Sequence, residues 1–482
     1  MNIVLLVVDS LRAASLETCT GTGPRTPFLR ELSAQSISFR RAYATECWTL
    51  PTHCSMFTGL LPSEHGAHFQ TMGYTRPAPT VAELLSQAGY HTEVVTRNFI
   101  FDGTIPGITR GFRKNTQLLS DAGRLNPFAL FLAISKPRFR RRIRTTGFFH
   151  PLQRENRRFL STFARALMPA DGLVLEYALS QMARYRQQRI PYFIFCNLYD
   201  VHAPYPPSPK SILRPFWSPR GCIENFTVPH ALSCLGSHTY LRPGFRLSGH
   251  SRRMLLDRYH RAIELMDAKL ADFYAGTRSA GLLDDTLLII TSDHGEAFGE
   301  HGLYLHDASA YDTHLHVPLW IHHPGRPCEN VDDVVSTRDL FGLIRDVGLG
   351  HNLERTILNR PYREGHPVAL AEHFYYPHAP EIDPRYRQNL KAMVAGTQKV
   401  IVRDQQVEYY DLGDDPAEQE PRSGRWGEIE AAWRHAGVPA SAISLALTQM
   451  RRWAGAAPVG ETRPRINGST CVELVAARAQ LS

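Results

Sequence analysis

Continuous apolar runs that end in polar residues recur along this chain. Residues 3–8 read Ile-Val-Leu-Leu-Val-Val and stop at Asp9, residues 192–198 form a second run, and residues 286–291 lead into Ser-Asp-His-Gly. Uninterrupted apolar runs of this length are typical of strands buried on both faces of a sheet. The pattern therefore predicts central strands that present polar side chains at their carboxyl ends.

Segments with helical spacing alternate with these runs. Residues 80–88 have the spacing of an amphipathic helix, a strand is expected over 92–96, and a long amphipathic helix over 253–274. Such alternation predicts an α/β fold whose site lies at the strand ends. We expect a catalytic domain over 1–384 with a long insertion at about 100–185.

The pattern changes near residue 385. Short apolar segments at 399–402 and 406–411 alternate with turn residues, which predicts a small antiparallel subdomain over 385–420. The segment 421–482 is expected to form a helical tail with two helices near Ala431 and Leu445. These helices are candidate interface elements, so the protein could form a homo-oligomer.

Composition limits the class of protein. Of 482 residues, 43% are apolar and 21% charged, which permits a sizeable core and excludes wholesale disorder. No apolar run is long enough for a transmembrane helix, and the N-terminus lacks the basic start and cleavage site of a signal peptide. The eight cysteines are scattered without a Cys-x-x-Cys motif, so thiols in a cytoplasmic protein are expected.

The charge balance is moderately basic. A net charge of +8 suits an anionic substrate or a membrane surface, and it does not by itself indicate a nucleic-acid partner. Nine Lys and Arg residues face a single acid between Lys136 and Arg158. This stretch is either a solvated insertion or a lid that gathers an anionic or membrane-borne substrate.

Three residues at predicted strand ends are candidate metal ligands. Asp9 ends the first run, and Asp293 and His294 follow the run at 286–291. With a hydroxyl oxygen from Thr49, they would form a donor set that suits Mn²⁺, Zn²⁺ or Ca²⁺. Asp9 alone could be a helix cap. The Asp-His pair after a buried strand has no evident packing purpose.

Thr49 is the candidate nucleophile. It lies just before Pro51, where a helix is expected to begin, and Thr58-Gly59 would end that helix. Backbone N–H groups at a helix N-terminus stabilise an oxyanion. A hydroxyl on a metal ion has a lowered pKa and becomes a nucleophile. The alternative is that Thr49 only caps the helix.

Five motifs in order along the chain resemble those of the sulfatase family of the alkaline phosphatase superfamily. The resemblance covers about residues 2–420, and the motifs lie at 8–12, 49–59, 200–205, 291–302 and 408–418. It implies an alkaline-phosphatase-like three-layer sandwich, in which helices flank a large mixed sheet and a small C-terminal antiparallel subdomain follows. It also implies metal-dependent ester hydrolysis.

The departures from the family pattern bear on the chemistry. Sulfatases carry a Cys or Ser that is oxidised to formylglycine, followed by x-Pro-Ser-Arg; this chain has Thr49 there and His53 in place of the arginine. Cys47 and Cys54 do not occupy the nucleophile position, because neither lies two residues before Pro51. Threonine cannot become formylglycine, and a sulfated threonine would need attack at sulfur. A phosphorylated threonine can be hydrolysed by a second in-line displacement, so phosphoryl transfer is favoured.

Other positions look like phosphonate monoester and phosphodiester hydrolases, and like lipoteichoic-acid-synthase-like transferases with a threonine nucleophile on one metal ion. Ser10 replaces the second aspartate of sulfatases, and His294 replaces an asparagine. A two-metal site would want an Asp-x-x-x-His segment, and Asp200 and His202 are too close together for that. One metal ion is therefore expected, with Mn²⁺ favoured over Zn²⁺ and Ca²⁺.

The resemblance implies roles for further residues. His202 would contact the transferring group or protonate the leaving oxygen. His306 falls where relatives place a Lys or His that contacts the substrate, although it could also be a loop histidine. Asn98, with Arg97 as a weaker candidate, would touch the phosphoryl oxygens. Arg12 could equally be a structural ion-pair partner.

The predicted function is a cytoplasmic, metal-dependent hydrolase or transferase. It would cleave a phosphodiester or phosphomonoester through a covalent phospho-Thr49 intermediate. Two alternatives stay open: a sulfuric ester hydrolase without formylglycine, and a catalytically silent relative that only binds. Retention of Asp9, Asp293 and His294 argues against the silent relative.

Overall fold

The structure is a computed structural model that describes residues 1–118, 171–205, 239–375 and 383–435, without Thr22, Asp307, 404–405 and 424–425. Ala231 and a few residues between 437 and 448 are also described. The basic stretch 136–158 and the end of the predicted tail lie outside the described residues. Among the described helices, none is long and apolar enough to cross a membrane.

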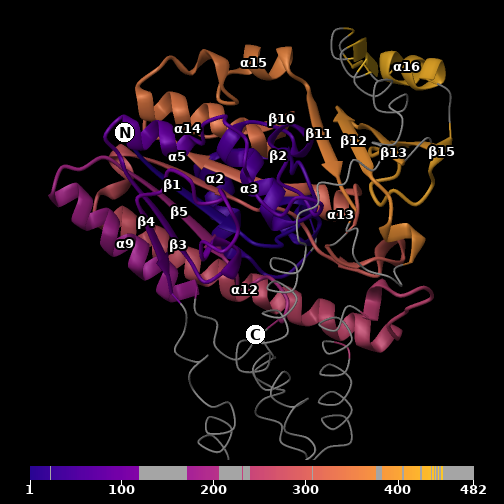
Figure 1. Cartoon of the computed structure of the whole chain (residues 1–482), viewed down its shortest axis with the longest axis horizontal. Helices are drawn as coiled ribbons and strands as arrows, with labels where there is room; N and C mark the ends of the chain where they lie inside the picture. Colours follow the sequence, from indigo (N-terminus) through magenta and orange to yellow (C-terminus); the bar gives the residue numbers. More distant parts are fainter. Residues whose placement is uncertain are drawn as a thin grey trace, which may run out of the picture.

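A mixed eight-stranded sheet forms the centre of the molecule (Figure 1). β1 lies between β5 and β6 and runs parallel to both, whereas β9 runs antiparallel to β2 and β6. Parallel neighbours bring their carboxyl ends to one edge. The strand order is β10 (Glu329–Ser336), β2 (Ile37–Tyr43), β9 (His316–His322), β6 (Thr286–Thr291), β1 (Asn2–Val8), β5 (Tyr192–Leu198), β3 (His91–Thr96) and β4 (Lys114–Gln117).

Helices cover both faces of this sheet. Alternate residues of β1 point to opposite sides, so Ile3 and Leu5 join one apolar cluster while Val4 and Leu6 join another. The cluster of Ile3 contains residues of α3 (Thr49–Thr58), α5 (Val81–Gln87) and α14 (Leu340–Leu349). The cluster of Val4 contains residues of α2 (Pro27–Gln35), α9 (Asp171–Gln187) and α12 (Gly249–Ser279). The predicted three-layer α/β sandwich is confirmed.

A smaller antiparallel sheet lies beside the large one (Figure 1). Its first strand begins at Val368, inside the segment that we assigned to the catalytic domain, because the β11–β12 pairing joins 368–373 to 390–395. The predicted domain boundaries themselves stay predictions. The strands are β11 (Val368–His373), β12 (Leu390–Ala395), β13 (Gln398–Arg403), β14 (Gln406–Asp411) and β15 (Arg422–Ser423), followed by α16 (Trp426–His435).

A buried ion cluster links the small sheet to the domain that contains the large sheet. Lys399 of β13 is fully buried, and its Nζ lies 2.6 Å from Asp312 Oδ1 and 2.7 Å from Glu418 Oε1. Removing one partner of a buried ion cluster is strongly destabilising because it leaves an uncompensated charge. The small sheet is therefore held by charge as well as by apolar packing.

The local signals place most elements where the sequence predicted them. α5 begins after Thr80, whose side chain accepts from the Glu83 N–H while Glu83 bonds back to the Thr80 N–H. The predicted helix 253–274 is longer than expected, because Ser248 caps α12 by accepting from Ser251 N–H. The remaining short elements are α1 (Glu17–Thr20), α4 (Pro62–His65), β7 (Ala297–Phe298), β8 (Tyr304–Leu305), α13 (Asp312–Leu315) and α15 (Arg360–Gly365).

Candidate active site

The predicted metal ligands meet at the carboxyl ends of the central strands. Asp9 follows β1, and Asp293 and His294 follow β6 by two and three residues. One donor atom from each of the three lies within 4.8 Å of the others, and all three side chains are fully buried. The site therefore arises from adjacent parallel strands, as the sequence pattern predicted.

Hydrogen bonds hold the two carboxylates in place. Asp9 Oδ2 accepts from the side-chain amides of Asn98 at 3.0 Å and Asn197 at 3.3 Å. Asp293 Oδ1 accepts from the N–H groups of Ser10 at 3.1 Å and His294 at 2.9 Å. Among the described residues, Asp293 Oδ2 accepts no hydrogen bond although it is buried, and it lies 3.4 Å from His294 Nε2. A buried carboxylate oxygen without a donor fits a metal ligand, because a cation would satisfy it.

The electrostatics of the cluster fit a divalent cation. Burial and the neighbouring charge of Asp293 raise the pKa of Asp9 to about 6, and burial raises the pKa of Asp293 to about 7. Burial lowers the pKa of His294 to about 3, so its imidazole is neutral and can ligate metal. Two adjacent buried carboxylates repel each other, and a bound cation would offset that repulsion.

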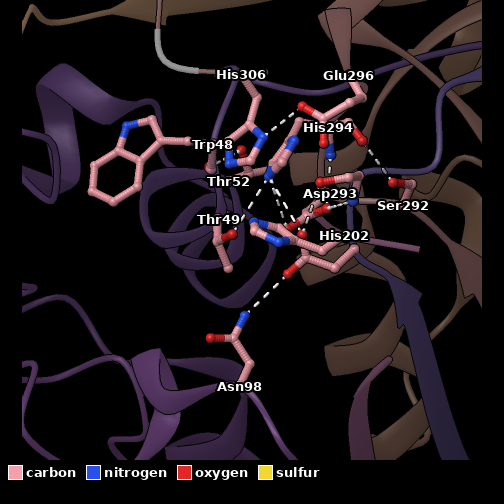
Figure 2. A network of polar contacts seen from close by, with 12 residues as sticks. Trp48, Thr49, Thr52, Asn98, His202, Ser292, Asp293, His294, Glu296 and His306 are labelled. Carbon is pink, nitrogen blue, oxygen red and sulfur yellow. Dashed lines mark hydrogen bonds and ion pairs between the residues drawn. The ribbon is translucent and has the colours of Figure 1, made fainter. Parts of the chain in front are cut away.

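Thr49 occupies the first position of α3 and faces this cluster (Figure 2). Its Oγ1 lies 3.4 Å from His294 Nε2. Every residue of α3 is buried, and the helix ends at Gly59, whose φ of 72° is the left-handed conformation that glycine adopts easily. A fully packed helix fixes where its N-terminal N–H groups point, so Thr49 is held rigidly beside the carboxylates.

His53 lies one helical turn after Thr49 and also borders the site. Its Nδ1 lies 2.7 Å from the Thr49 carbonyl oxygen and 3.8 Å from Asp293 Oδ2. Burial lowers the pKa of His53 to about 3, so the ring is neutral. The position that carries an arginine in sulfatases therefore contributes no positive charge here.

Two further histidines lie together on another side of the cluster (Figure 2). The ring centroid of His306 is 4.9 Å from that of His202 and 4.4 Å from that of His294. Glu296 Oε1 lies 2.9 Å from His306 Nδ1, and its Oε2 accepts from the Tyr205 hydroxyl at 2.9 Å. His202 Nδ1 lies 2.6 Å from the Ala203 carbonyl oxygen, so Nδ1 carries the proton and Nε2 is the basic atom.

Asn98 and Arg97, which we expected to contact the phosphoryl oxygens, both bond to carboxylates of the protein instead. The Asn98 amide is directed at Asp9, and its Oδ1 accepts from Ile100 N–H. Arg97 forms ion pairs with Asp200 at 2.8 Å and Asp171 at 3.6 Å. Asn98 thus holds the carboxylate of Asp9, a candidate metal ligand, and Arg97 is engaged in ion pairs with Asp200 and Asp171.

Three site residues received no role from the sequence. Asn197 supports Asp9, Glu296 orients His306, and Ser10 bonds both carboxylates. Asn197 is a polar residue inside an otherwise apolar run, and Glu296 follows Asp293 closely, so both carried a weak signal. Arg12 pairs with Glu300 at 2.8 Å, which is the structural role left open for it.

Known proteins show the same sequence pattern and architecture. The sulfatase family model matches residues 1–347. Choline-sulfatase of Rhizobium meliloti is 24% identical over 364 residues, a match that covers 71% of this chain and 68% of that enzyme. Human iduronate 2-sulfatase is 21% identical over 362 residues, covering 68% of this chain and only 60% of its own length.

Solved structures agree on the fold. The phosphonate monoester hydrolase of Agrobacterium radiobacter superposes with a TM-score of 0.62 at 17% identity, covering 95% of this chain and 98% of that one. A phosphonate monoester hydrolase from Silicibacter pomeroyi gives the same TM-score at 18% identity, covering 94% of each chain. With the family match over most of its length, the chain belongs to the sulfatase family and is a hydrolase of phosphoric or sulfuric esters.

Proposed function

We propose that this chain hydrolyses phosphodiesters or phosphomonoesters through a covalent phospho-Thr49 intermediate. The observation that carries the proposal is the Thr49 hydroxyl at the start of a buried helix, 3.4 Å from His294 Nε2 and facing the carboxylate cluster. Asp9, Asp293 and His294 would hold one divalent cation, which supplies Lewis-acid charge to the nucleophile and the phosphoryl oxygens.

The side chains of the site can carry out both displacements. Thr49 Oγ loses its proton to solvent and attacks phosphorus, and the P–O bond to the leaving alcohol breaks. His202, in its protonated form, gives the leaving oxygen a proton. Water then attacks phosphorus in line and gives a proton to His202, the P–O bond to Thr49 breaks, and Thr49 takes a proton from solvent; a monoester substrate releases phosphate and a diester releases a phosphomonoester. Thr49 begins α3, and N–H groups in the first turn of a helix would stabilise the developing negative charge.

The donor set favours Mn²⁺ among the candidate cations. It consists of carboxylate, imidazole and hydroxyl groups without a thiolate. Oxygen-rich sites of this kind suit manganese, with Ca²⁺ and Zn²⁺ as alternatives. A cytoplasmic location is part of the proposal, supported by the thiol state of the described cysteines Cys19, Cys47, Cys54, Cys196 and Cys328.

A basic pocket lined by residues that precede His306 along the chain is consistent with an anionic substrate. Its volume is about 580 Å³, and its lining includes Arg246, Arg252, His301 and Tyr304. Tyr304 belongs to β8, which ends immediately before His306. The guanidinium groups of this pocket are candidates to bind a negatively charged part of the substrate.

The second candidate is sulfuric ester hydrolysis. It is favoured by the sequence relatives, of which choline-sulfatase and iduronate 2-sulfatase are named for sulfate esters. The phosphonate monoester hydrolases among the structural neighbours favour phosphorus chemistry instead. Thr49 decides our preference, because a threonine ester has no aldehyde form through which sulfate could be released.

The test compares Mn²⁺-supplemented turnover of an aryl phosphodiester, an aryl phosphomonoester and an aryl sulfate, with Thr49→Ala and Thr49→Ser alongside. We expect phosphoester turnover that falls by about 10³-fold or more in Thr49→Ala and is partly kept in Thr49→Ser. Sulfate turnover that survives Thr49→Ala would contradict the assignment of the nucleophile. No turnover of any ester despite bound metal would favour a specialised transferase or a binding role.

A further inference from the structure

A second buried cluster of metal-ligating groups lies just before the nucleophile helix. Glu46 and Cys47 belong to the short segment between β2 and α3, and His373 is the last residue of β11. One donor atom from each lies within 4.8 Å of the others, and all three residues are buried. The active site described above uses none of these residues.

The three donors converge on one side of the imidazole. His373 Nδ1 lies 2.9 Å from Glu46 Oε1 and 3.5 Å from Cys47 Sγ. In a nucleophilic Cys-His-Glu triad, the carboxylate and the thiol would contact opposite nitrogens of the ring. Convergence of both on Nδ1 is instead the arrangement of a chelate.

Two further polar atoms of the cluster are buried without a hydrogen-bond partner among the described residues. Within the described part of the chain, Glu46 Oε2 and His373 Nε2 have no hydrogen-bond partner, although the two residues are only 1% and 2% exposed. A buried carboxylate oxygen without a donor is costly unless a cation or water satisfies it. Glu46 Oε1 already accepts from Cys47 N–H at 2.9 Å, so its second oxygen is free to bind.

We propose that Glu46, Cys47 and His373 bind a thiophilic divalent cation, Zn²⁺ by its chemistry, at a site separate from the catalytic one. Thiolate, imidazole and carboxylate are all zinc ligands, and thiolate excludes Mn²⁺ and Ca²⁺ as the preferred ions. The Cys47 thiol gives up its proton when the ion binds. Glu46 Oε2 or a water fills the fourth position.

The place of this cluster in the fold indicates a structural role. Glu372 N–H donates to the Thr45 carbonyl oxygen at 2.9 Å, which already joins β11 to the segment before α3. The Trp48 ring stacks on Phe69 at a centroid distance of 4.0 Å, and Phe69 lies 6.1 Å from the His373 ring. Figure 2 shows Trp48 directed away from the catalytic cluster. An ion here would anchor the start of α3, and hence Thr49, to the small sheet.

The experiment replaces bound metal with Co²⁺ in the full-length protein and records absorption and metal content. We expect a near-ultraviolet thiolate-to-cobalt charge-transfer band and about two metal equivalents per chain. Cys47→Ser should lose the band and about one equivalent. Asp293→Ala should also lose about one equivalent but keep the band. Cys54→Ser removes another buried thiol, one turn into α3, and should change neither quantity.

A wild-type protein without the charge-transfer band, or a band that persists in folded Cys47→Ser, would overturn the proposal. If Cys47→Ser does not fold, zinc X-ray absorption of the wild-type protein decides instead. A sulfur scatterer at about 2.3 Å supports the site, and a spectrum with only nitrogen and oxygen scatterers overturns it. Both readouts are independent of esterase activity, so failure of this site and failure of the phospho-Thr49 mechanism are distinguishable.

Discussion

Two buried donor clusters flank the start of α3, and they differ in origin and chemistry. The catalytic cluster gathers Asp9, Asp293 and His294 from the ends of parallel strands. The second cluster takes Glu46 and Cys47 from the segment before the helix and His373 from the edge of the small sheet. The first offers oxygen and nitrogen donors beside a hydroxyl, and the second includes a thiol.

The two proposals therefore assign different kinds of ion to the two clusters. Hard donors beside Thr49 favour a cation that polarises phosphoryl oxygens, whereas a thiolate favours a cation that binds tightly and stays. The catalytic cluster borders Thr49, the proposed nucleophile, and the pair of His202 and His306, which suits a catalytic role. The second cluster borders aromatic packing, as a structural anchor requires.

The largest effect is expected from Asp293→Ala. The variant removes the carboxylate whose Oδ2 is unsatisfied among the described residues, so it should lower activity by about 10³-fold or more through loss of the catalytic cation. Steady-state rates and metal analysis measure the two effects together. Cys54→Ser serves as the control for a substitution in the same core. Full activity of Asp293→Ala without bound metal would contradict a catalytic role for the cluster of Asp9, Asp293 and His294.

A smaller effect is expected from Asn98→Ala. Asn98 donates to Asp9 at 3.0 Å, so its loss should weaken Mn²⁺ affinity by about 10- to 100-fold while KM at saturating metal changes little. Metal titration followed by kinetics at high Mn²⁺ separates the two parameters. A raised KM with unchanged metal affinity would instead support the contact with phosphoryl oxygens that the sequence predicted.

Glu296→Gln tests how the histidine pair is oriented. The carboxylate of Glu296 lies 2.9 Å from His306 Nδ1, and loss of its charge should lower kcat by about tenfold and shift the pH profile. Tyr205→Phe removes only the other hydrogen bond of Glu296 and is the matched control. Equal effects from both variants would mean that packing around Glu296, rather than its bond to His306, sets the rate.

The fold and the meeting of the three candidate metal ligands could be predicted because both depend on local patterns. The apolar run 192–198 became β5 with the same bounds, and strand-end residues such as Asp9 and Asp293 met at one edge because parallel strands must align there. The family motifs added Thr49. Its place at the start of α3 followed from Pro51 and Gly59, which mark the two ends of the helix.

The second cluster could not be predicted in this way. Glu46 and His373 are separated by 327 positions, and β2, which precedes Glu46, belongs to a different sheet from β11, which ends at His373. The direction of the Asn98 amide also depended on tertiary contacts, because its nearest charged partner, Asp9, comes from another strand. The pattern of apolar and polar residues predicts at which edge of the sheet polar side chains lie. Which of these side chains contact one another depends on the packing of the whole fold.

The smallest predicted effect concerns the stability of metal-free protein at different pH. The folded-state pKa of Asp9 is about 6 and that of Asp293 about 7, both above the ordinary value of an aspartate, so unfolding favours loss of their protons. Their contribution to the free energy of unfolding is therefore fully present below pH of about 4 and is lost as pH rises through about 7. Buried histidines such as His53 and His294, whose pKa values are lowered, act in the opposite direction, so the carboxylate contribution is measured as the difference in Tm between the wild-type protein and Asp293→Asn. With chelator present, the Tm of the wild-type protein relative to that of Asp293→Asn should fall by a few degrees between about pH 5.5 and 8, and Mn²⁺ should restore it. A difference that does not change over this range would mean that positively charged side chains already compensate the two carboxylates.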